Sequence, residues 1–143
     1  MRPIQNVALI AHDNRKQELI EWLKVHQEKI INCHIITTGT TGKLIEESTS
    51  LNVERMHSGP LGGDQQIGAK ISEGKVDLLI FFWDPLEPMS HDPDIKALLR
   101  LSTLWNIPIA CNKSTADFII KSPLMFDYHR DVPNFDDYQS RKV

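Results

Sequence analysis

Short runs of wholly apolar residues alternate with longer amphipathic segments along this sequence. The clearest run is Leu78–Trp83, in which every residue is apolar, and Val7–Ala11 has the same character. A strand with this composition is buried on both faces, as occurs in parallel sheets that helices cover on either side. We therefore predict strands at Val7–Ala11, Cys33–Thr37, Val53–His57, Leu78–Trp83 and Ile107–Cys111.

Segments with helical spacing follow the predicted strands. In Asp94–Asn106, for example, Ile95, Leu98 and Leu99 fall on one face. Strict alternation of strands and helices predicts a three-layer α/β/α sandwich around a five-stranded, mainly parallel, doubly wound sheet. The alternating pattern of Val53–His57 indicates a strand near an edge of that sheet. The predicted helices are Lys16–His26, Gly42–Ser50, Asp64–Glu73 ended by Gly74, Asp94–Asn106 capped by Asp92 or Asp94, and Ser114–Lys121 with Ser114 as N-cap.

The length of 143 residues fits one domain, which we expect to span residues 1–143. Its C-terminal part, from about residue 122, is predicted to be an irregular tail, because Pro123 blocks the preceding helix and the following residues are aperiodic. Phe126, Tyr128 and Phe135 of this tail would be exposed on a body of this size. Exposed apolar groups of this kind usually mark interfaces, so we predict an oligomer rather than a monomer.

Composition and charge exclude several classes of function. The formal net charge of −3 argues against bulk electrostatic binding of nucleic acid. We also expect no membrane partner, because no apolar run is long enough to span a bilayer and no secretory signal is visible. Cys33 and Cys111 stand far apart in apolar surroundings, which predicts buried free thiols in a reducing compartment and a cytoplasmic protein. No metal site is expected, because neither an HExxH motif nor a zinc-type Cys/His spacing occurs.

Ligands of doubly wound sheets bind at the carboxyl ends of the strands, where polar and glycine-rich residues gather in this chain. Thr38–Gly42 offers the glycines and hydroxyls of an anion cradle at a helix start, although an ordinary capped turn has the same composition. It is not a Walker A loop, because Thr37 and Leu44 stand where that motif needs Gly and Ser or Thr. Hydrolysis of a nucleoside triphosphate is therefore disfavoured.

Further groups at the same edge can carry chemistry. Asp64 follows a glycine-rich turn and opens a helix, so it is either a carboxylate that stabilises the helix start or a general base. His12 and Asp13 are adjacent, and Lys16 lies one helical turn further on, where it can reach a phosphate. His91 is either an ordinary loop residue or an acid or electrophile that titrates near neutral pH.

Four segments together resemble the methylglyoxal synthase family: HDNRK at residues 12–16, TTGTTG at 37–42, SGPLGGDQQIG at 58–68 and HDPDIKALLR at 91–100. The resemblance extends from Val7 to about Ile120. It implies an allosteric, cytoplasmic homohexamer that is inhibited by phosphate. The implied reaction converts dihydroxyacetone phosphate to methylglyoxal and inorganic phosphate without a metal or an organic cofactor.

The resemblance also implies roles for individual residues. Asp64 would be the catalytic base, and His91 would be the imidazole that acts on the substrate oxygens. Asp13 and Asp94 would be supporting carboxylates near the chemistry. The residues that would contact the substrate and its phosphate are His12, Lys16, Thr38, Gly39, Thr40, Thr41, Ser58 and Gly59.

Residue types alone leave alternatives open. An isomerase would form the same enediolate, so only the resemblance favours a lyase over an isomerase. A regulatory domain of the kind found in carbamoyl phosphate synthetase would bind a phosphorylated effector without turnover, but the Asp64 and His91 motifs count against it. A phospho-receiver domain is disfavoured, because the third predicted strand ends without the phosphoacceptor aspartate that such a domain needs.

Overall fold

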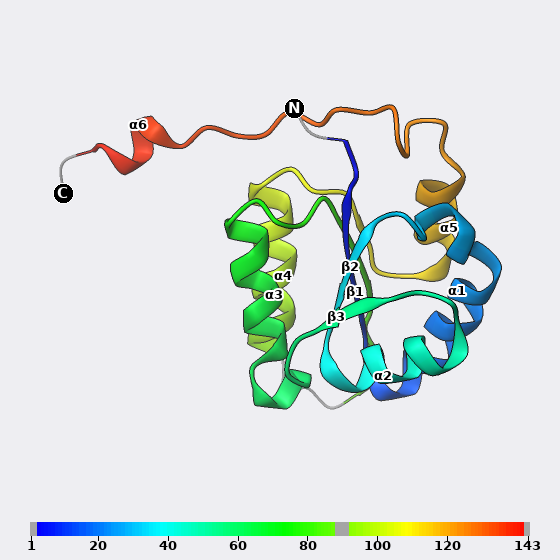
Figure 1. Ribbon diagram of the computed structural model, residues 1–143. Coiled ribbons are helices and arrows are strands. Elements are labelled where there is room, and N and C mark those ends of the chain that lie inside the picture. The colour runs from blue at the N-terminus through cyan, green and yellow to red at the C-terminus, as the bar shows by residue number, and fades with distance from the viewer. Residues whose placement is uncertain (1–2, 88–91, 142–143) are drawn as a thin grey trace.

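Five parallel strands form one sheet in the computed structural model, which describes residues 3–87 and 92–141 (Figure 1). The strands are β1 (Asn6–Ala11), β2 (His34–Thr37), β3 (Val53–Arg55), β4 (Leu78–Phe82) and β5 (Ile109–Ala110). Their order is β3-β2-β1-β4-β5, which confirms the doubly wound sheet and puts β3 at an edge, as predicted. In the centre of the sheet, Val7 is paired with Ile35 on one side and with Leu78 on the other.

Helices cover both faces of this sheet. They are α1 (Lys16–Ile30), α2 (Gly39–Ser48), α3 (Gly63–Ser72), α4 (Asp92–Leu104) and α5 (Lys113–Lys121). The short α6 (Asp136–Gln139) lies in the C-terminal tail. On one face α1 packs against α2 and α5, and on the other face α3 packs against α4 (Figure 1). This arrangement confirms the predicted three-layer sandwich.

Alternate side chains of the central strands enter two separate apolar clusters. Leu9 and Ile80 belong to the cluster that α1 and α5 cover. Ile10 and Phe81 belong to the cluster that α3 and α4 cover. Because both faces of β1 and β4 are buried, alternation with polar residues would place polar groups in a core. The buried part of β1, Val7–Ala11, and the whole of β4 are therefore apolar.

Two helices begin earlier than their apolar periodicity predicts. Helix α2 starts at Gly39 rather than at Gly42, because Thr38 is extended (φ −74°, ψ 157°) and the helix follows it directly. Helix α4 starts at Asp92. Asp92 and Asp94 therefore both lie in its first turn, and the expectation that one of them is the N-cap is wrong.

The cap of α5 also differs from the prediction. Ser114 lies inside this helix, and the N-cap is Asn112, whose side chain accepts a hydrogen bond from the Thr115 N–H at 2.9 Å. An N-cap side chain accepts from a residue two or three positions further on, which Asn112 can do here. The predicted end of α3 is confirmed, because Gly74 adopts the left-handed conformation (φ 75°) just after it.

The irregular tail after α5 docks on the amino-terminal edge of the sheet. Arg130 is buried, and its Nη2 lies 3.4 Å from Oδ1 of Asp77, which immediately precedes β4. Its Nη1 donates a hydrogen bond of 2.8 Å to the carbonyl oxygen of Trp105. The ring of Phe135 packs edge-on against that of Trp105, with 5.0 Å between centroids. Beyond this contact the tail and α6 project away from the body (Figure 1).

Apolar groups of the tail are only partly exposed. The exposed fractions of Phe126 and Tyr128 are 47% and 42%, as predicted. The expectation for Phe135 is wrong, because its contact with Trp105 makes it partly buried. The tail therefore leaves some of its apolar side chains in the solvent and packs others against the body.

Two predictions from composition have different outcomes. Cys33 and Cys111 are free, but they are half-buried rather than fully buried. Burial nevertheless raises the pKa of both thiols. Within the described part of the chain, no helix combines the length and apolar character needed to cross a membrane.

Candidate active site

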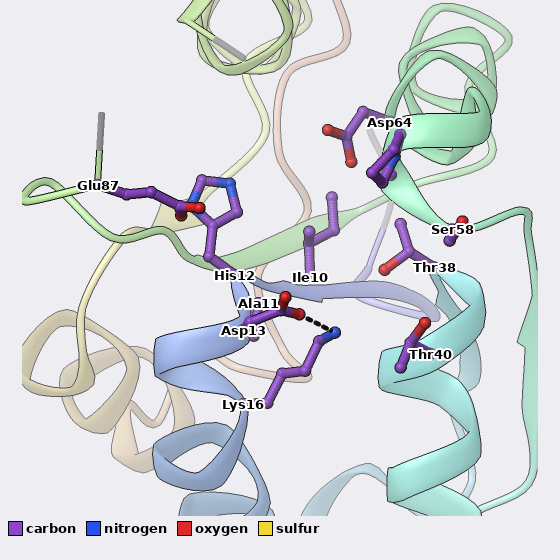
Figure 2. Close-up of a pocket in the computed structure, with 12 residues that line it drawn as sticks. Ile10, Ala11, His12, Asp13, Lys16, Thr38, Thr40, Ser58, Asp64 and Glu87 are labelled. Carbon is purple, nitrogen blue, oxygen red and sulfur yellow. Dashed lines mark hydrogen bonds and ion pairs between the residues drawn. The ribbon is translucent and has the colours of Figure 1, made fainter. Parts of the chain in front are cut away.

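The loops that follow β1, β2, β3 and β4 line a cavity of about 270 Å³ at the carboxyl edge of the sheet (Figure 2). This is the edge at which the sequence predicts a site, and the volume suits a small metabolite rather than a large ligand. The predicted site residues that line it are His12, Asp13, Lys16, Thr38, Thr40, Ser58, Gly59 and Asp64.

The N-terminus of α2 faces this cavity. Thr38 and Thr40 line it, whereas Thr41 is buried and Gly39 does not line it. The N–H of Gly39 donates to the carbonyl oxygen of His57 at 3.2 Å, so it is already used within the fold. The N–H groups of Thr40 and Thr41 belong to the first helical turn and have no acceptor inside the helix. Together with the helix dipole, they make this end of the cavity favourable for an anion.

A cation lies across the cavity from that helix start. Lys16 begins α1, and its Nζ lies 2.6 Å from Oδ1 of Asp13 in the short turn before it. The hydrogen bond from Lys16 lowers the pKa of the Asp13 carboxyl, which is therefore ionised at neutral pH. Figure 2 shows the ammonium group of Lys16 directed toward the side of the cavity formed by Thr38 and Thr40. The cavity therefore has two features that attract a phosphate, a cation and a helix N-terminus.

A tight glycine turn holds Asp64 in the wall of the cavity. Gly62 has a φ of 100°, which favours glycine, and precedes α3. A Cβ on Gly63 would lie 1.9 Å from the carbonyl oxygen of His57, so no other residue fits that position without backbone movement. Asp64 follows in the first turn of α3 with 8% of its surface exposed.

Gly59 and Asp64 lie close together in this wall. A Cβ added to Gly59 would be 3.6 Å from both carboxylate oxygens of Asp64, so the absence of a side chain keeps that face of the carboxylate open. The first-turn position of Asp64 agrees with its stabilising the helix start, and its burial beside the cavity is also what a general base requires.

His12 is held by the chain that follows β4. Its Nδ1 accepts a hydrogen bond of 3.0 Å from the backbone N–H of Asp84. An Nδ1 that accepts a hydrogen bond carries no proton, so the neutral ring has its proton on Nε2. Its ring packs edge-on against Phe81, with 5.4 Å between centroids. His12 thus offers one N–H donor, from Nε2.

Asp84 supports this contact and is itself firmly bound. Its Oδ2 accepts a hydrogen bond of 2.9 Å from Nδ2 of Asn14, and its Oδ1 accepts one of 2.9 Å from the N–H of Leu86. These two hydrogen bonds lower the pKa of the Asp84 carboxyl. The sequence analysis did not single out Asn14 or Asp84. Asp84 could have been found, because it is an acidic residue directly after the predicted buried strand Leu78–Trp83.

Besides Gly39 and Thr41, Asp94 is a predicted site residue that does not line the cavity. Asp94 accepts a hydrogen bond of 2.5 Å from Nε2 of Gln65 and lines a groove between α3 and α4 that Asp64 also lines. Its predicted role as a supporting carboxylate near the chemistry stays a prediction. His91 lies outside the described residues. Lining residues that the sequence did not single out are Ile10, Ala11, Pro60 and Glu87. In residues 3–87 and 92–141 no cluster of His, Cys, Asp or Glu side chains has the arrangement of a metal site.

The fold and the cavity are those of a doubly wound α/β domain with a small pocket at the carboxyl edge of its sheet, whose lining is favourable for an anion. Comparison with known proteins narrows this class. Residues 18–111 match a family model described as the MGS-like domain. The chain is 64% identical to methylglyoxal synthase of Hahella chejuensis over 140 residues, which are 98% of this chain and 92% of that protein.

Other relatives agree. Methylglyoxal synthase of Saccharophagus degradans is 56% identical over 97% of this chain and 91% of its own length. A crystal structure of methylglyoxal synthase from Elizabethkingia anophelis matches with a TM-score of 0.89 and 48% identity, covering 99% of this chain and 94% of that one. The chain belongs to the methylglyoxal synthase family, a family of lyases, and the resemblance seen in its motifs is confirmed.

Proposed function

We propose that this chain eliminates phosphate from dihydroxyacetone phosphate to give methylglyoxal and inorganic phosphate. The observation that carries the proposal is one cavity, in a member of the methylglyoxal synthase family, that is lined by a buried carboxylate and lies between a cation and a helix N-terminus. Proton removal needs the first feature and phosphate binding needs the second. A purely regulatory domain would need no base, and Asp64 therefore favours the enzyme.

The phosphate group of the substrate would bind between Lys16 and the start of α2. Its negative charge would interact with the Lys16 ammonium and with the first-turn N–H groups of Thr40 and Thr41. The hydroxyl groups of Thr38 and Ser58 line the same space and can donate further hydrogen bonds. Because Lys16 is also paired with Asp13, a bound phosphate would share this ammonium with a carboxylate.

Asp64 would remove the proton from the hydroxymethyl carbon next to the ketone. The electrons of that C–H bond form the C=C bond of an enediolate, and negative charge collects on the former ketone oxygen. A donor beside this oxygen lowers the barrier, and the Nε2–H of His12 is such a donor. The family resemblance assigns a second imidazole, His91, to the substrate oxygens.

Phosphate would leave in the following step. The proton of the hydroxyl group passes to the former ketone oxygen, which carries the negative charge. A carbonyl then forms at the carbon that lost its hydrogen, the double bond moves to the phosphate-bearing carbon, and the carbon–oxygen bond to phosphate breaks with its electron pair on phosphate. The enol that remains takes up a proton on carbon, loses the proton on oxygen and becomes methylglyoxal. The cationic end of the cavity stabilises the departing phosphate, because that group gains charge as it leaves.

The first experiment is an assay with dihydroxyacetone phosphate in which methylglyoxal and free phosphate are followed together. Equal release of the two products supports the proposal. Formation of glyceraldehyde phosphate instead would show an isomerase, and tight binding without turnover would show a regulatory domain.

Asp64→Asn tests the role of the base directly. Asparagine keeps the size and an acceptor oxygen at the helix start, so the loss of stability should be about 1 kcal/mol or less. Loss of a positioned base should slow turnover by roughly 10²–10⁴-fold. Exchange of the substrate's carbon-bound hydrogen with solvent should slow equally. Glu18→Gln, in the first turn of α1 and outside the cavity lining, is the matched control. If Asp64→Asn exchanges that hydrogen at the wild-type rate, another group is the base.

The family resemblance further suggests a cytoplasmic homohexamer that phosphate inhibits. Exposure of Phe126 and Tyr128 supports an assembly, since a monomer would leave these rings in water. The two free cysteines fit a reducing compartment. Light scattering at micromolar concentration measures the assembly, and a monomeric mass would refute it.

A further inference from the structure

His12 and Asn14 are joined through a residue 70 positions away from Asn14. Asn14 stands in the short turn after β1, two residues beyond His12. Its Nδ2 donates to Oδ2 of Asp84 at 2.9 Å, and the backbone N–H of Asp84 donates back to Nδ1 of His12 at 3.0 Å. The turn after β1 and the chain after β4 thus hold each other through two hydrogen bonds.

The side chain of Asp84 is held as well as its backbone N–H. The Asp84 carboxylate is buried and is fixed at both oxygens, by Asn14 on one side and by the Leu86 N–H on the other. The second bond is local, only two residues away, and would persist if the whole loop moved. The backbone N–H of His12 donates to the carbonyl oxygen of Phe82 at 3.1 Å and fixes the end of β4 beside β1. The bond from Asn14 is the side-chain bond that ties Asp84 itself to the turn after β1, and it helps to keep the Asp84 N–H in front of the imidazole.

Glu87 lies close to Nδ1 of His12 and competes with the Asp84 N–H for this nitrogen. Oε2 of Glu87 is 3.7 Å from Nδ1 of His12, beyond hydrogen-bond distance, and the Glu87 side chain is half-exposed. A carboxylate is an acceptor only, so it attracts a proton to Nδ1, whereas the Asp84 N–H excludes one. If the Asp84 N–H moved away, Glu87 would favour a protonated Nδ1, and the neutral ring would then present Nε2 as an acceptor.

We propose that Asn14 is a positioning residue that acts through Asp84 to keep His12 in the form with its proton on Nε2. One part of this inference rests on the proposed function, namely that the Nε2–H of His12 stabilises an oxygen of the substrate. The state of the ring itself is a property of the resting protein. Removal of Asn14 should therefore change the ring even where no substrate is present.

Nitrogen NMR of protein labelled with ¹⁵N-histidine tests the ring directly. In the wild type, Nδ1 of His12 should show the shift of an unprotonated nitrogen and Nε2 that of a protonated one. In Asn14→Ala both shifts should move toward the values of a ring with protonated Nδ1. Asn52→Ala, an exposed asparagine on another loop, should leave them unchanged. Identical His12 shifts in wild type and Asn14→Ala would overturn the proposal.

Swapping the side chains of Asn14 and Asp84 gives a second, independent test. Asn14→Asp places two carboxylates together and should lower kcat by about 10- to 100-fold, the effect of a misplaced group in an active site. The double variant Asn14→Asp with Asp84→Asn restores one donor and one acceptor in reversed order, so it should regain most of kcat and the wild-type His12 shifts. Phosphate binding should stay constant throughout, because neither residue lies at the phosphate end. A double variant as slow as Asn14→Asp would overturn the proposal.

The two proposals fail in different ways. If the wild type releases no methylglyoxal, the proposed function fails, but the NMR result still decides the role of Asn14. If the wild type releases methylglyoxal normally and Asn14→Ala leaves the His12 nitrogen shifts or kcat unchanged, only the role of Asn14 fails.

Discussion

Replacement of Arg130 by methionine should destabilise the protein strongly without affecting the reaction. Arg130 has 3% of its surface exposed, and its partner Asp77 has none. Methionine retains a long apolar side chain but removes the guanidinium group. The Asp77 carboxylate would then be left buried with one oxygen deprived of its cation. Both residues lie at the edge of the sheet remote from the cavity, so turnover at 25 °C should be normal.

The size of the effect follows from the contacts. Removing one partner of a buried ion pair costs about 3–5 kcal/mol. Asp77 keeps three donors on Oδ2, namely the N–H groups of Gln5 and Asn6 and the Asn6 amide, at 3.1, 2.9 and 2.9 Å. The contact from Arg130 to Asp77 is long, at 3.4 Å. We therefore expect the lower end, about 3 kcal/mol. For a domain of this length, this corresponds to a fall in Tm of about 10 °C.

Thermal unfolding followed by circular dichroism measures this change. Arg55→Met is the matched control, because Arg55 forms a partly exposed ion pair with Glu46 at 3.4 Å, and such pairs contribute about 1 kcal/mol or less. Adding Asp77→Asn to Arg130→Met should recover part of the loss, because the buried negative charge that has lost its Arg130 partner disappears. A Tm of Arg130→Met equal to that of Arg55→Met would refute the reasoning.

Two further predictions concern a cation and a histidine. Lys16→Met should weaken phosphate binding by about 10- to 100-fold, the effect of losing one charged hydrogen bond, and an unchanged inhibition constant would remove Lys16 from the site. Burial lowers the pKa of His26, so the unfolded chain binds this proton more readily and Tm should fall as the pH drops through about 6.5. His26→Gln should flatten this dependence between pH 7.5 and 5.5, and an unaltered slope would assign it to other groups.

The layered fold was predictable because its signals are local. The burial of both faces of β1 and β4 leaves its mark within each strand, as an unbroken apolar run. The start of α2 was not predictable in the same way, because Gly39, Thr40 and Thr41 are loop-forming residue types and carry no apolar periodicity. Ser114 and Asn112 are both good N-cap residues, and only the bond from Thr115 decides between them.

The site was predictable to the extent that its groups share one edge of the sheet. The loops after four strands meet there by topology, so Asp64 and Lys16 could be assigned to one cavity from their positions alone. The pairing of Asn14 with Asp84 joins residues 70 positions apart and leaves no pattern in the sequence. Arg130 is a similar case, because an arginine in a polar tail is ordinarily solvated, and its burial depends on Asp77, 53 residues earlier.

The docking of the tail by Arg130 has a practical consequence for handling the protein. The cavity lies at one end of the strands and the tail leaves from the other (Figure 1). A strand of five or six residues separates these ends by roughly 20 Å. A fluorophore, affinity tag or solid support attached at the C-terminus would therefore leave the mouth of the cavity unobstructed, whereas attachment to the turn after β1 would block it. Immobilised preparations or sensors built on this fold should be joined through the C-terminus.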